Sequence, residues 1–492
     1  MPAPRKKTAA TPFWATADGE TVKLYLGNVT DVLAALPAKS VHMCVTSPPY
    51  WGLRAYATGD AKHQEIGAEP SPDCKTDGQA QCGRCFVCSM VAVFRKVRQV
   101  LRDDGTLWLN LGDTMGGGKS GRSDNDRISG PVGTRLAPDG TKPTKGGGFN
   151  GVGKSHLPPG NLVGVPWRVA LALQADGWVL RQDIIWAKPS PMPESVKNRC
   201  TKAHEYVFLF AKGPGYYYDA EAIKEKAEYY RPAVNGRGET PKYAEMQPSE
   251  TLSQVAENRN KRSVWTVAAA GYPGAHFACY PPKLIEPMIK AGTSERGACG
   301  SCGCPWVRVV EERKLTRERP NDYVKRTGED GTGNSCANTV AGVDVKTVGW
   351  RPGCECNGRL VKRKVRTTGR VDDAAEGKNQ MRLDMAYHSN KTTLGAYKNA
   401  EAHEEEKEVT VIEYVSELPL DDHPVVPCTV LDPFIGSGTT CCVALDLGRR
   451  SIGIDLSEQY LAKNSVPRIV GALASRPELA WLAGNKKERV EF

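Results

Sequence analysis

Two short stretches carry residue types that could grip and modify a flat, polar group such as a nucleobase. The first is Ser47-Pro48-Pro49-Tyr50, which follows the apolar run 41–45. That run is short enough to be a buried strand, and two prolines end a strand because they cannot donate to a sheet ladder. The turn offers oxygen acceptors for an amino edge and a ring for the face of a base. A rigid surface turn explains the same pattern, because four-residue matches arise by chance.

The second stretch is a strand that runs into a glycine-rich turn and then a helix. The stretch 429–440 starts as a strand and runs into a turn that contains Gly436 and Gly438. A further strand ends in Asp455, at the distance of about 20 residues from Gly436 that a nucleoside-binding unit requires. In such units the glycines permit close backbone approach and the acid takes the ribose hydroxyls.

Strand and helix patterns elsewhere supply the elements that must position these residues. Helices are predicted at 31–36, 90–101, 161–175 and 441–447, and strands at 22–28, 106–111, 179–186, 206–210 and 450–455. Asp103-Asp104-Gly105 is expected to end the second helix. Lys188 and His204-Glu205 fall at strand margins, where a histidine is more often structural.

Together the two stretches resemble the amino-methyltransferases of DNA, in the permuted group whose catalytic motif precedes the cofactor motif. In that family (Asp/Asn/Ser)-Pro-Pro-(Tyr/Phe/Trp) is catalytic, and Asp-Pro-Phe-x-Gly-x-Gly-Thr-Thr binds S-adenosylmethionine. The resemblance continues at 107–113, 186–188, 204–208 and 276–281. It implies an α/β, Rossmann-like methyltransferase core, with a mostly parallel, doubly wound sheet and inserted zinc-binding and target-recognition segments.

The resemblance also assigns roles. Ser47 Oγ and the Pro48 carbonyl would accept the two protons of an exocyclic amine, and Tyr50 would stack on a flipped base. The helix that follows the glycine turn would favour the cofactor carboxylate, and Asp432 or a neighbour would meet its ammonium. The catalytic residues are predicted to be Ser47, Pro48, Pro49 and Tyr50. The cofactor-binding residues are predicted to be Asn28, Asp432, Phe434, Gly436, Gly438, Thr439 and Asp455.

The target base is predicted from Ser47. In the resembled family, serine before Pro-Pro is commoner in enzymes that methylate cytosine N4, so we favour that base, with adenine N6 as the alternative. Related tetrapeptides serve methylation of RNA or of protein amides, and an inert core that binds DNA through zinc is a further alternative. The expected partner is double-stranded DNA. A cognate restriction enzyme and the oligomeric state stay open.

Cysteines form two groups with the spacing of metal ligands. One group holds Cys74, Cys82, Cys85 and Cys88, and the other holds Cys299, Cys302, Cys354 and Cys356. Four thiolates suit tetrahedral zinc, so structural Zn is the predicted metal, with Cys304 as a substitute ligand in the second group. An iron–sulfur cluster in the first group and free thiols in turns are the alternatives.

Composition and charge indicate how the chain is organised. The net charge of +10 is compatible with a polyanionic partner. No apolar run approaches about 18 residues, which predicts no membrane span, and the basic N-terminal stretch lacks a signal-peptide core. We therefore expect a cytoplasmic protein, encoded by a bacterium or by a phage in a bacterial host. The glycine-rich 148–155 matches a phosphate-loop pattern but lacks its strand and helix.

The expected domain plan interrupts one core with insertions. Residues 1–20 form a disordered basic arm, 21–219 the first core part, and 266–296 with 426–470 the second. The segments outside or within the core are a four-cysteine insertion at 70–90, a mobile loop at 113–160, a target-recognition segment at 220–265, a partly disordered zinc-ribbon-like insertion at 297–425 and a tail at 471–492.

Overall fold

The computed structural model describes residues 10–52, 66–74, 82–116, 157–158, 160–191, 193–226, 258–269, 280–316, 340–356, 358–371, 403–416 and 422–479. The chain divides into two compact units. The first contains residues 1–298, 305–350 and 425–492, and the second contains 299–304 and 351–424. The insertion expected at 297–425 is therefore divided, because 305–350 belong with the first unit. Most of the expected mobile loop, the phosphate-loop-like pattern and residues 227–257 of the expected recognition segment lie outside the described residues.

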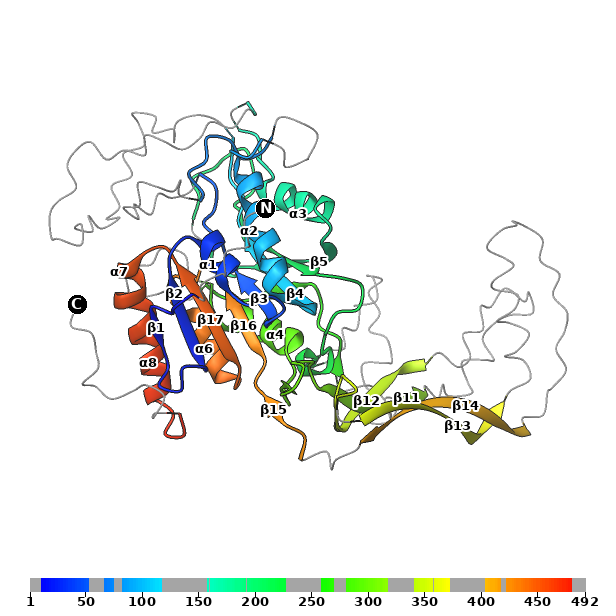
Figure 1. Cartoon of the computed structure of the whole chain (residues 1–492). Coiled ribbons are helices and arrows are strands. Elements are labelled where there is room, and N and C mark those ends of the chain that lie inside the picture. The colour runs from blue at the N-terminus through cyan, green and yellow to red at the C-terminus, as the bar shows by residue number, and fades with distance from the viewer. Residues whose placement is uncertain are drawn as a thin grey trace, which may run out of the picture. The chain divides into compact units, whose positions relative to one another are not determined.

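The first unit is built on a nine-stranded sheet (Figure 1). Its order is β1 (Trp14–Ala15), β2 (Val22–Leu26), β17 (Arg450–Asp455), β16 (Thr429–Asp432), β3 (Val41–Thr46), β4 (Leu101–Leu111), β6 (His204–Ala211), β5 (Val179–Ala187) and β9 (Val264–Thr266). The adjacent strands β2, β17, β16, β3 and β4 are parallel. Strand β6 is antiparallel to both its neighbours, β4 and β5. The predicted α/β core with a mostly parallel sheet is confirmed.

Helices cover both faces of this sheet (Figure 1). One face packs against α1 (Val29–Ala35), α2 (Phe86–Val100) and α3 (Val165–Ala175), and the other against α4 (Pro282–Gly292), α6 (Thr439–Asp446) and α8 (Val466–Ala474). Side chains alternate between the faces as a pleated strand requires. In β6, Phe208 and Phe210 join the first core, while Val207 and Leu209 join the second.

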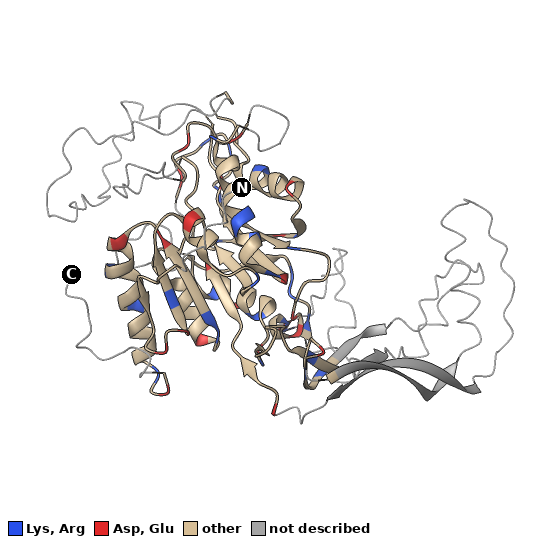
Figure 2. Cartoon of the chain, in the orientation of Figure 1, with Lys and Arg blue, Asp and Glu red and all other residues tan. Residues whose placement is uncertain are grey.

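The central strands are apolar. Neither β3 nor β16 contains Lys or Arg, and Asp432 is their one acidic residue (Figure 2). Parallel strands of this kind are almost continuously apolar in sequence, because helices cover both faces of the sheet and bury the side chains on each. Among the described residues, no helix combines the length and apolar character that a membrane span requires.

Three predicted boundaries are wrong. Helix α3 begins at Val165, with Gly164 as its N-cap, rather than at residue 161. Helix α2 begins at Phe86, with Cys85 as its N-cap, rather than at Met90. Strand β4 begins at Leu101, so 103–105 lie inside a strand instead of a turn. The reason is the pairing with β3, which starts at Val41 opposite Leu101 and resumes after an irregularity at Met43 opposite Thr106.

Shorter elements complete the chain. A 3-10 helix (Glu221–Ile223), α7 (Glu458–Tyr460) and a π-helix (Leu461–Ser465) belong to the first unit. Strand pairs are formed by β7 (Glu225–Lys226) with β8 (Asn258–Arg259), β10 (Ala298–Cys299) with β15 (Val425–Val426), and β11 (Val307–Thr316) with β12 (Val340–Arg351). The second unit contains the antiparallel pair β13 (Gly358–Val371) and β14 (His403–Ser416).

Candidate active site and cysteine clusters

One edge of the sheet gathers the predicted site residues. The parallel strands β2, β17, β16, β3 and β4 all end there, and the antiparallel β6 begins there. This is the edge at which open α/β sheets bind ligands. Two stretches nearly 400 positions apart meet directly, because Thr46 Oγ1 donates to Asp432 Oδ1 at 2.6 Å across 386 positions of the sequence.

Tyr50 is fixed at this edge by its hydroxyl and its ring. The hydroxyl donates to Glu205 Oε2 at 2.7 Å and lies 3.0 Å from Asn110 Oδ1. Ser47 Oγ donates to the same hydroxyl at 3.2 Å. The ring lies so close to Gly112 that a Cβ there would be 2.6 Å from Tyr50 Cε2. Tyr50 therefore has a defined position beside Ser47.

Glu205 of β6 contacts the turn 47–50, which is predicted to be catalytic and is named the catalytic turn, and it also contacts Asn110 of β4 and Lys188 directly after β5. It forms an ion pair with Lys188, and both side chains are largely buried. Asn110 Nδ2 donates to Glu205 Oε2 at 3.3 Å and to the Tyr206 carbonyl at 3.1 Å. The ring of His204, by contrast, packs edge-on against Tyr206. Sequence reasoning did not assign roles to Asn110 and Glu205, although both lie in segments that resemble the family.

Asp432 is buried, and its carboxylate is occupied by the protein itself. Besides Thr46, it accepts hydrogen bonds from Thr440 Oγ1 at 2.5 Å, Tyr280 Oη at 2.8 Å and the Phe434 backbone N–H at 3.1 Å. Burial raises the pKa of this carboxyl group. These contacts join β3 and β16 to the start of α6, and the predicted contact of Asp432 with a cofactor stays a prediction.

The glycine turn has the backbone that its sequence predicts. Gly436 and Gly438 have φ values of 49° and 80°, in the left-handed region that favours glycine. Gly438 is the N-cap of α6 and supplies no side-chain cap, so the first N–H groups of the helix are available to a ligand. Thr439 is buried and accepts a hydrogen bond from Arg468 Nη1 at 2.7 Å, and Phe434 is half-buried against the core.

Asp455 and Asn28 lie at the ends of neighbouring strands. Asp455 accepts hydrogen bonds from the backbone N–H groups of Gly436 at 3.2 Å and Ser457 at 2.8 Å. Burial raises the pKa of its carboxyl group to about 6. Asn28 caps α1, accepting from the Thr30 N–H at 2.9 Å. The Asp455 side chain thus lies directly beside the glycine turn, as the sequence spacing predicts.

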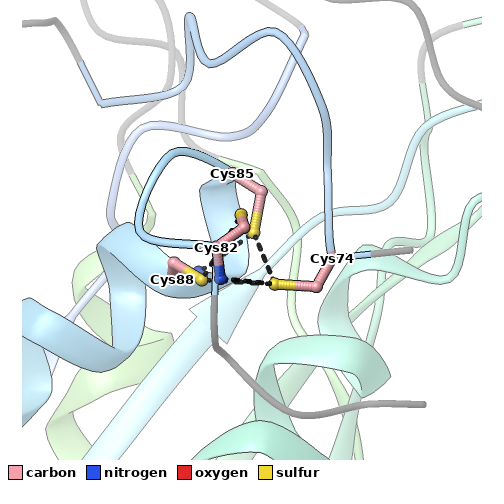
Figure 3. A group of neighbouring side chains, drawn as sticks. All are labelled: Cys74, Cys82, Cys85 and Cys88. Atoms are coloured by element: carbon pink, nitrogen blue, oxygen red, sulfur yellow. Dashed lines mark hydrogen bonds between the residues drawn. The ribbon is translucent and has the colours of Figure 1, made fainter. Parts of the chain in front are cut away.

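The first cysteine group converges in space (Figure 3). Its four Sγ atoms all lie within 4.8 Å of one another. The Sγ of Cys74 is 3.7 Å from that of Cys85 and 3.4 Å from that of Cys88, and Cys82 Sγ is 3.8 Å from Cys88 Sγ. Four thiols so close together can coordinate one ion.

The second cysteine group also converges, within the second unit. The Sγ atoms of Cys299, Cys302, Cys354 and Cys356 lie within 4.8 Å of one another. Cys304 is outside this set, and its carbonyl instead accepts from the Cys299 N–H at 2.8 Å. The pair Cys299 and Cys302 thus meets the pair Cys354 and Cys356, as the sequence predicts. Cys304, the predicted substitute ligand, is not among the four converging thiols.

Comparison with known proteins identifies relatives of the chain. The family described as DNA methylase, which groups N6 and N4 enzymes, matches residues 41–299 and 362–465. The chain is 39% identical over 276 residues to the Type II methyltransferase M.SmaI of Serratia marcescens, an alignment that covers 56% of this chain and 76% of the relative. It is 28% identical over 495 residues to M.SfiI of Streptomyces fimbriatus, covering 95% of each.

A solved structure similar in part is that of PvuII DNA methyltransferase (cytosine-N4-specific), at 14% identity and a TM-score of 0.39, covering 92% of this chain and 87% of that one. The family match spans most of the chain and includes both the catalytic turn and the glycine turn. The chain therefore belongs to the N6/N4 DNA methylase family and is a DNA methyltransferase.

Proposed function

We propose that the protein transfers a methyl group from S-adenosylmethionine to the exocyclic amine of a base flipped out of duplex DNA, with cytosine N4 as the acceptor. The observation that carries this proposal is the junction of the catalytic turn and the glycine turn at neighbouring strand ends, where Thr46 bonds to Asp432. A base held by the first turn then lies next to a methyl donor held by the second.

The residues present fit such a donor. The bound cofactor supplies an electrophilic methyl group on a sulfonium. The uncapped start of α6 favours a carboxylate, and the half-buried Asp455 beside Gly436 is placed to accept ribose hydroxyls. Gly436 and Gly438 hold the turn in its left-handed conformation, and the missing Cβ at Gly438 lets the turn pack against Ser465. The other predicted cofactor residues, Asn28, Phe434 and Thr439, stay in the proposal as neighbours of this turn.

The catalytic turn activates the amine by accepting hydrogen bonds from its two N–H groups. The N–CH3 bond forms as the S–CH3 bond breaks, S-adenosylhomocysteine leaves, and the surplus N–H proton passes to solvent. An exocyclic amine is a weak nucleophile because its lone pair is delocalised into the ring. The Ser47 hydroxyl donates to Tyr50, which leaves its oxygen lone pairs for one amino proton, while the Pro48 carbonyl takes the other. Both contacts favour a pyramidal nitrogen as the bond to the methyl group forms, and no covalent enzyme intermediate is required.

The choice of cytosine over adenine rests on Ser47, the residue type commoner before Pro-Pro in enzymes that act on cytosine N4. Adenine N6 is the alternative. Membership in a DNA methylase family favours DNA over RNA or protein amides, and the intact catalytic and glycine turns argue against an inert core.

We propose Zn²⁺ as the metal of both cysteine groups, because four converging thiolates with these spacings are typical of structural zinc sites. Elemental analysis of the purified chain should give two zinc ions per chain. We further propose a cognate restriction enzyme as a partner, and action in the cytoplasm of a bacterial host, since the relatives named above are bacterial Type II methyltransferases.

Substitution of Asp455 tests the cofactor assignment. Asp455→Ala should abolish measurable binding of S-adenosylmethionine by calorimetry and with it methyl transfer to DNA. Ser47→Ala should keep cofactor binding but slow methyl transfer by about a hundredfold, because one amino proton loses its acceptor. Full turnover by Asp455→Ala would contradict the proposed function.

A further inference from the structure

We propose that a zinc ion bound by Cys74, Cys82, Cys85 and Cys88 is a brace for the catalytic turn, so that occupancy of this metal site sets the rate of methyl transfer. The inference rests on the proposed function, and it adds a positioning role that a merely structural metal would not have.

The sulfur arrangement fits zinc. A tetrahedral ion with Zn–S bonds of about 2.3 Å separates its sulfur atoms by about 3.8 Å. The observed separations of 3.4, 3.7 and 3.8 Å lie near this value (Figure 3). Backbone N–H groups also donate to the sulfurs, from Cys82 to Cys74, from Arg84 to Cys82 and from Cys88 to Cys85. Such donors stabilise thiolates, the form that binds metal.

The four ligands lie at two places along the chain. Cys82 precedes α2, and Cys85 and Cys88 lie at its start, where the helix anchors them in the core. Cys74 lies in the segment 66–74, which forms no helix or strand. Backbone bonds from Phe86 to the Ser71 carbonyl and from Val87 to the Pro72 carbonyl hold this segment along the helix start. A metal would add the cross-link that ties Cys74 to α2.

The same segment forms the support for the catalytic turn. The Gly52 N–H donates to the Gly67 carbonyl at 3.0 Å, and Trp51 Nε1 donates to the Glu69 carbonyl at 2.9 Å. A Cβ at Gly67 would lie 3.1 Å from the Tyr50 carbonyl oxygen and 3.3 Å from Pro49 Cβ. Trp51 is only 3% exposed, so its position depends on these contacts.

Inside the segment, Glu69 is buried at 2% exposure, and its Oε2 accepts from the Gly67 N–H at 2.8 Å. Asp73, next to the metal ligand, pairs with Arg168 of α3. The segment is therefore pinned at its far end by the metal and by α3, and it transmits that constraint to residues 49–52. Loss of the metal would remove this constraint at Cys74, so the segment 66–74 would hold residues 49–52, next to Ser47, less firmly.

The test variant is Cys82→Ala, because Cys82 is the exposed member of the group and its removal leaves the core intact. Cys302→Ala removes an equally exposed member of the other group, and Cys200→Ala removes an exposed cysteine outside both groups. Cys82→His is the rescue, since an imidazole can replace a thiolate on zinc.

Three quantities are measured for each full-length variant: zinc per chain after dialysis against a weak chelator, backbone hydrogen exchange of the peptide that covers 47–52, and the single-turnover rate on mixed-sequence duplex DNA with saturating S-adenosylmethionine. Cys82→Ala should lose one zinc, exchange faster at Trp51 and Gly52, and react about tenfold or more slowly, while its cofactor affinity stays within about twofold. Cys82→His should restore all three.

Cys302→Ala should also lose one zinc but leave exchange at 47–52 unchanged, and Cys200→Ala should keep both ions. Zinc loss in Cys82→Ala with unchanged exchange and rate would overturn the brace, and a wild-type chain without metal at this group would overturn the site. If no variant, including wild type, methylates DNA, the proposed function fails, while the metal and exchange measurements still decide the brace.

Discussion

Tyr50 illustrates how this site depends on contacts beyond its own motif. Its hydroxyl is fixed by Glu205 and Asn110, and its ring packs on Gly112. Glu205 is held in turn by Lys188. The ring that is proposed to stack on the base is therefore held by Asn110 of β4, Glu205 of β6 and Lys188, which directly follows β5. Catalysis by positioning requires such support.

Gly112→Ala tests this support. The added Cβ would lie 2.6 Å from the Tyr50 ring, so the ring must move and its hydroxyl must leave Glu205. We expect kcat/KM for DNA methylation to fall by about tenfold or more, with cofactor affinity unchanged in calorimetry. The matched control is Gly215→Ala, where a Cβ would meet open space. Equal activity of the two variants would show that the ring position is unimportant.

Asp455 predicts a pH dependence of cofactor binding. Burial raises the pKa of its carboxyl group to about 6, and the ionised form is the one that accepts two ribose hydroxyls well. As pH falls below about 6, the group takes up a proton and affinity should weaken by up to about tenfold per pH unit. Calorimetric titrations from about pH 5 to pH 7 would measure this trend.

Asp455→Asn is the control for that trend, because it should bind more weakly at pH 7 and show little further change toward pH 5. The same raised pKa lowers the stability of the unliganded fold as pH rises from about 4 to about 6, since the native state there holds a proton that the unfolded chain has lost. A wild-type affinity that is constant across this range would contradict the assignment.

At the residue scale, the motif residues could be predicted from sequence because their order and spacing are local. A role could be assigned to Ser47, Tyr50, Gly436 and Asp455 from the strand and turn pattern that directly surrounds each residue. Asn110 and Glu205 could not be assigned, because their part in the site depends on β4 pairing with β6, nearly a hundred residues later.

At the element scale, the junction between β3 and β16 organises the site. Asp432 receives hydrogen bonds from Thr46 of β3, Thr440 of α6, the backbone N–H of Phe434, and Tyr280, which lies two residues before α4. A buried carboxylate is costly unless such donors surround it. Its four partners explain how an acidic residue is tolerated between otherwise apolar strands.

Asp432→Asn should destabilise the fold by about 2–4 kcal/mol, because an amide places a donor against the Thr440 and Tyr280 hydroxyls. Asp446→Asn, at the end of α6, is the control: Asp446 is solvent-exposed in its ion pair with Arg476, so the loss should stay below about 1 kcal/mol. Urea denaturation followed by circular dichroism measures both. A similarly small decrease in the free energy of unfolding in the two variants would contradict the claim that the Asp432 hydrogen bonds stabilise the junction of β3 and β16.

Elements with a strong local pattern were predicted well, including β3, β5, β6 and the body of α2. The boundaries failed for different reasons. Helix α2 starts four residues before Met90 because Cys85 caps it by accepting from the Cys88 N–H. This contact is local, but cysteine is not among the preferred cap residues. The turn expected at 103–105 is part of β4 because pairing with β3 extends the strand, and that pairing is not visible in the sequence around these residues.

At the scale of the whole molecule, the chain places the strands of its predicted cofactor motif between strands from its N-terminal part. Strands β16 and β17, from the C-terminal part, lie between β2 and β3 of the N-terminal part. The inserted residues 299–304 and 351–424 form a unit of their own. The resemblance to permuted methyltransferases implied the fold and this order of motifs. The division of 297–425 between two units did not follow from composition.

The most direct test of the central claim is the identity of the methylated product. The purified protein is incubated with labelled S-adenosylmethionine and unmethylated mixed-sequence duplex DNA, and the DNA is digested to nucleosides for mass spectrometry. We predict N4-methylcytosine, formed about a hundredfold more slowly by Ser47→Ala. N6-methyladenine would keep the site and the mechanism but contradict the reading of Ser47, and no methylated nucleoside despite cofactor binding would contradict the proposed reaction.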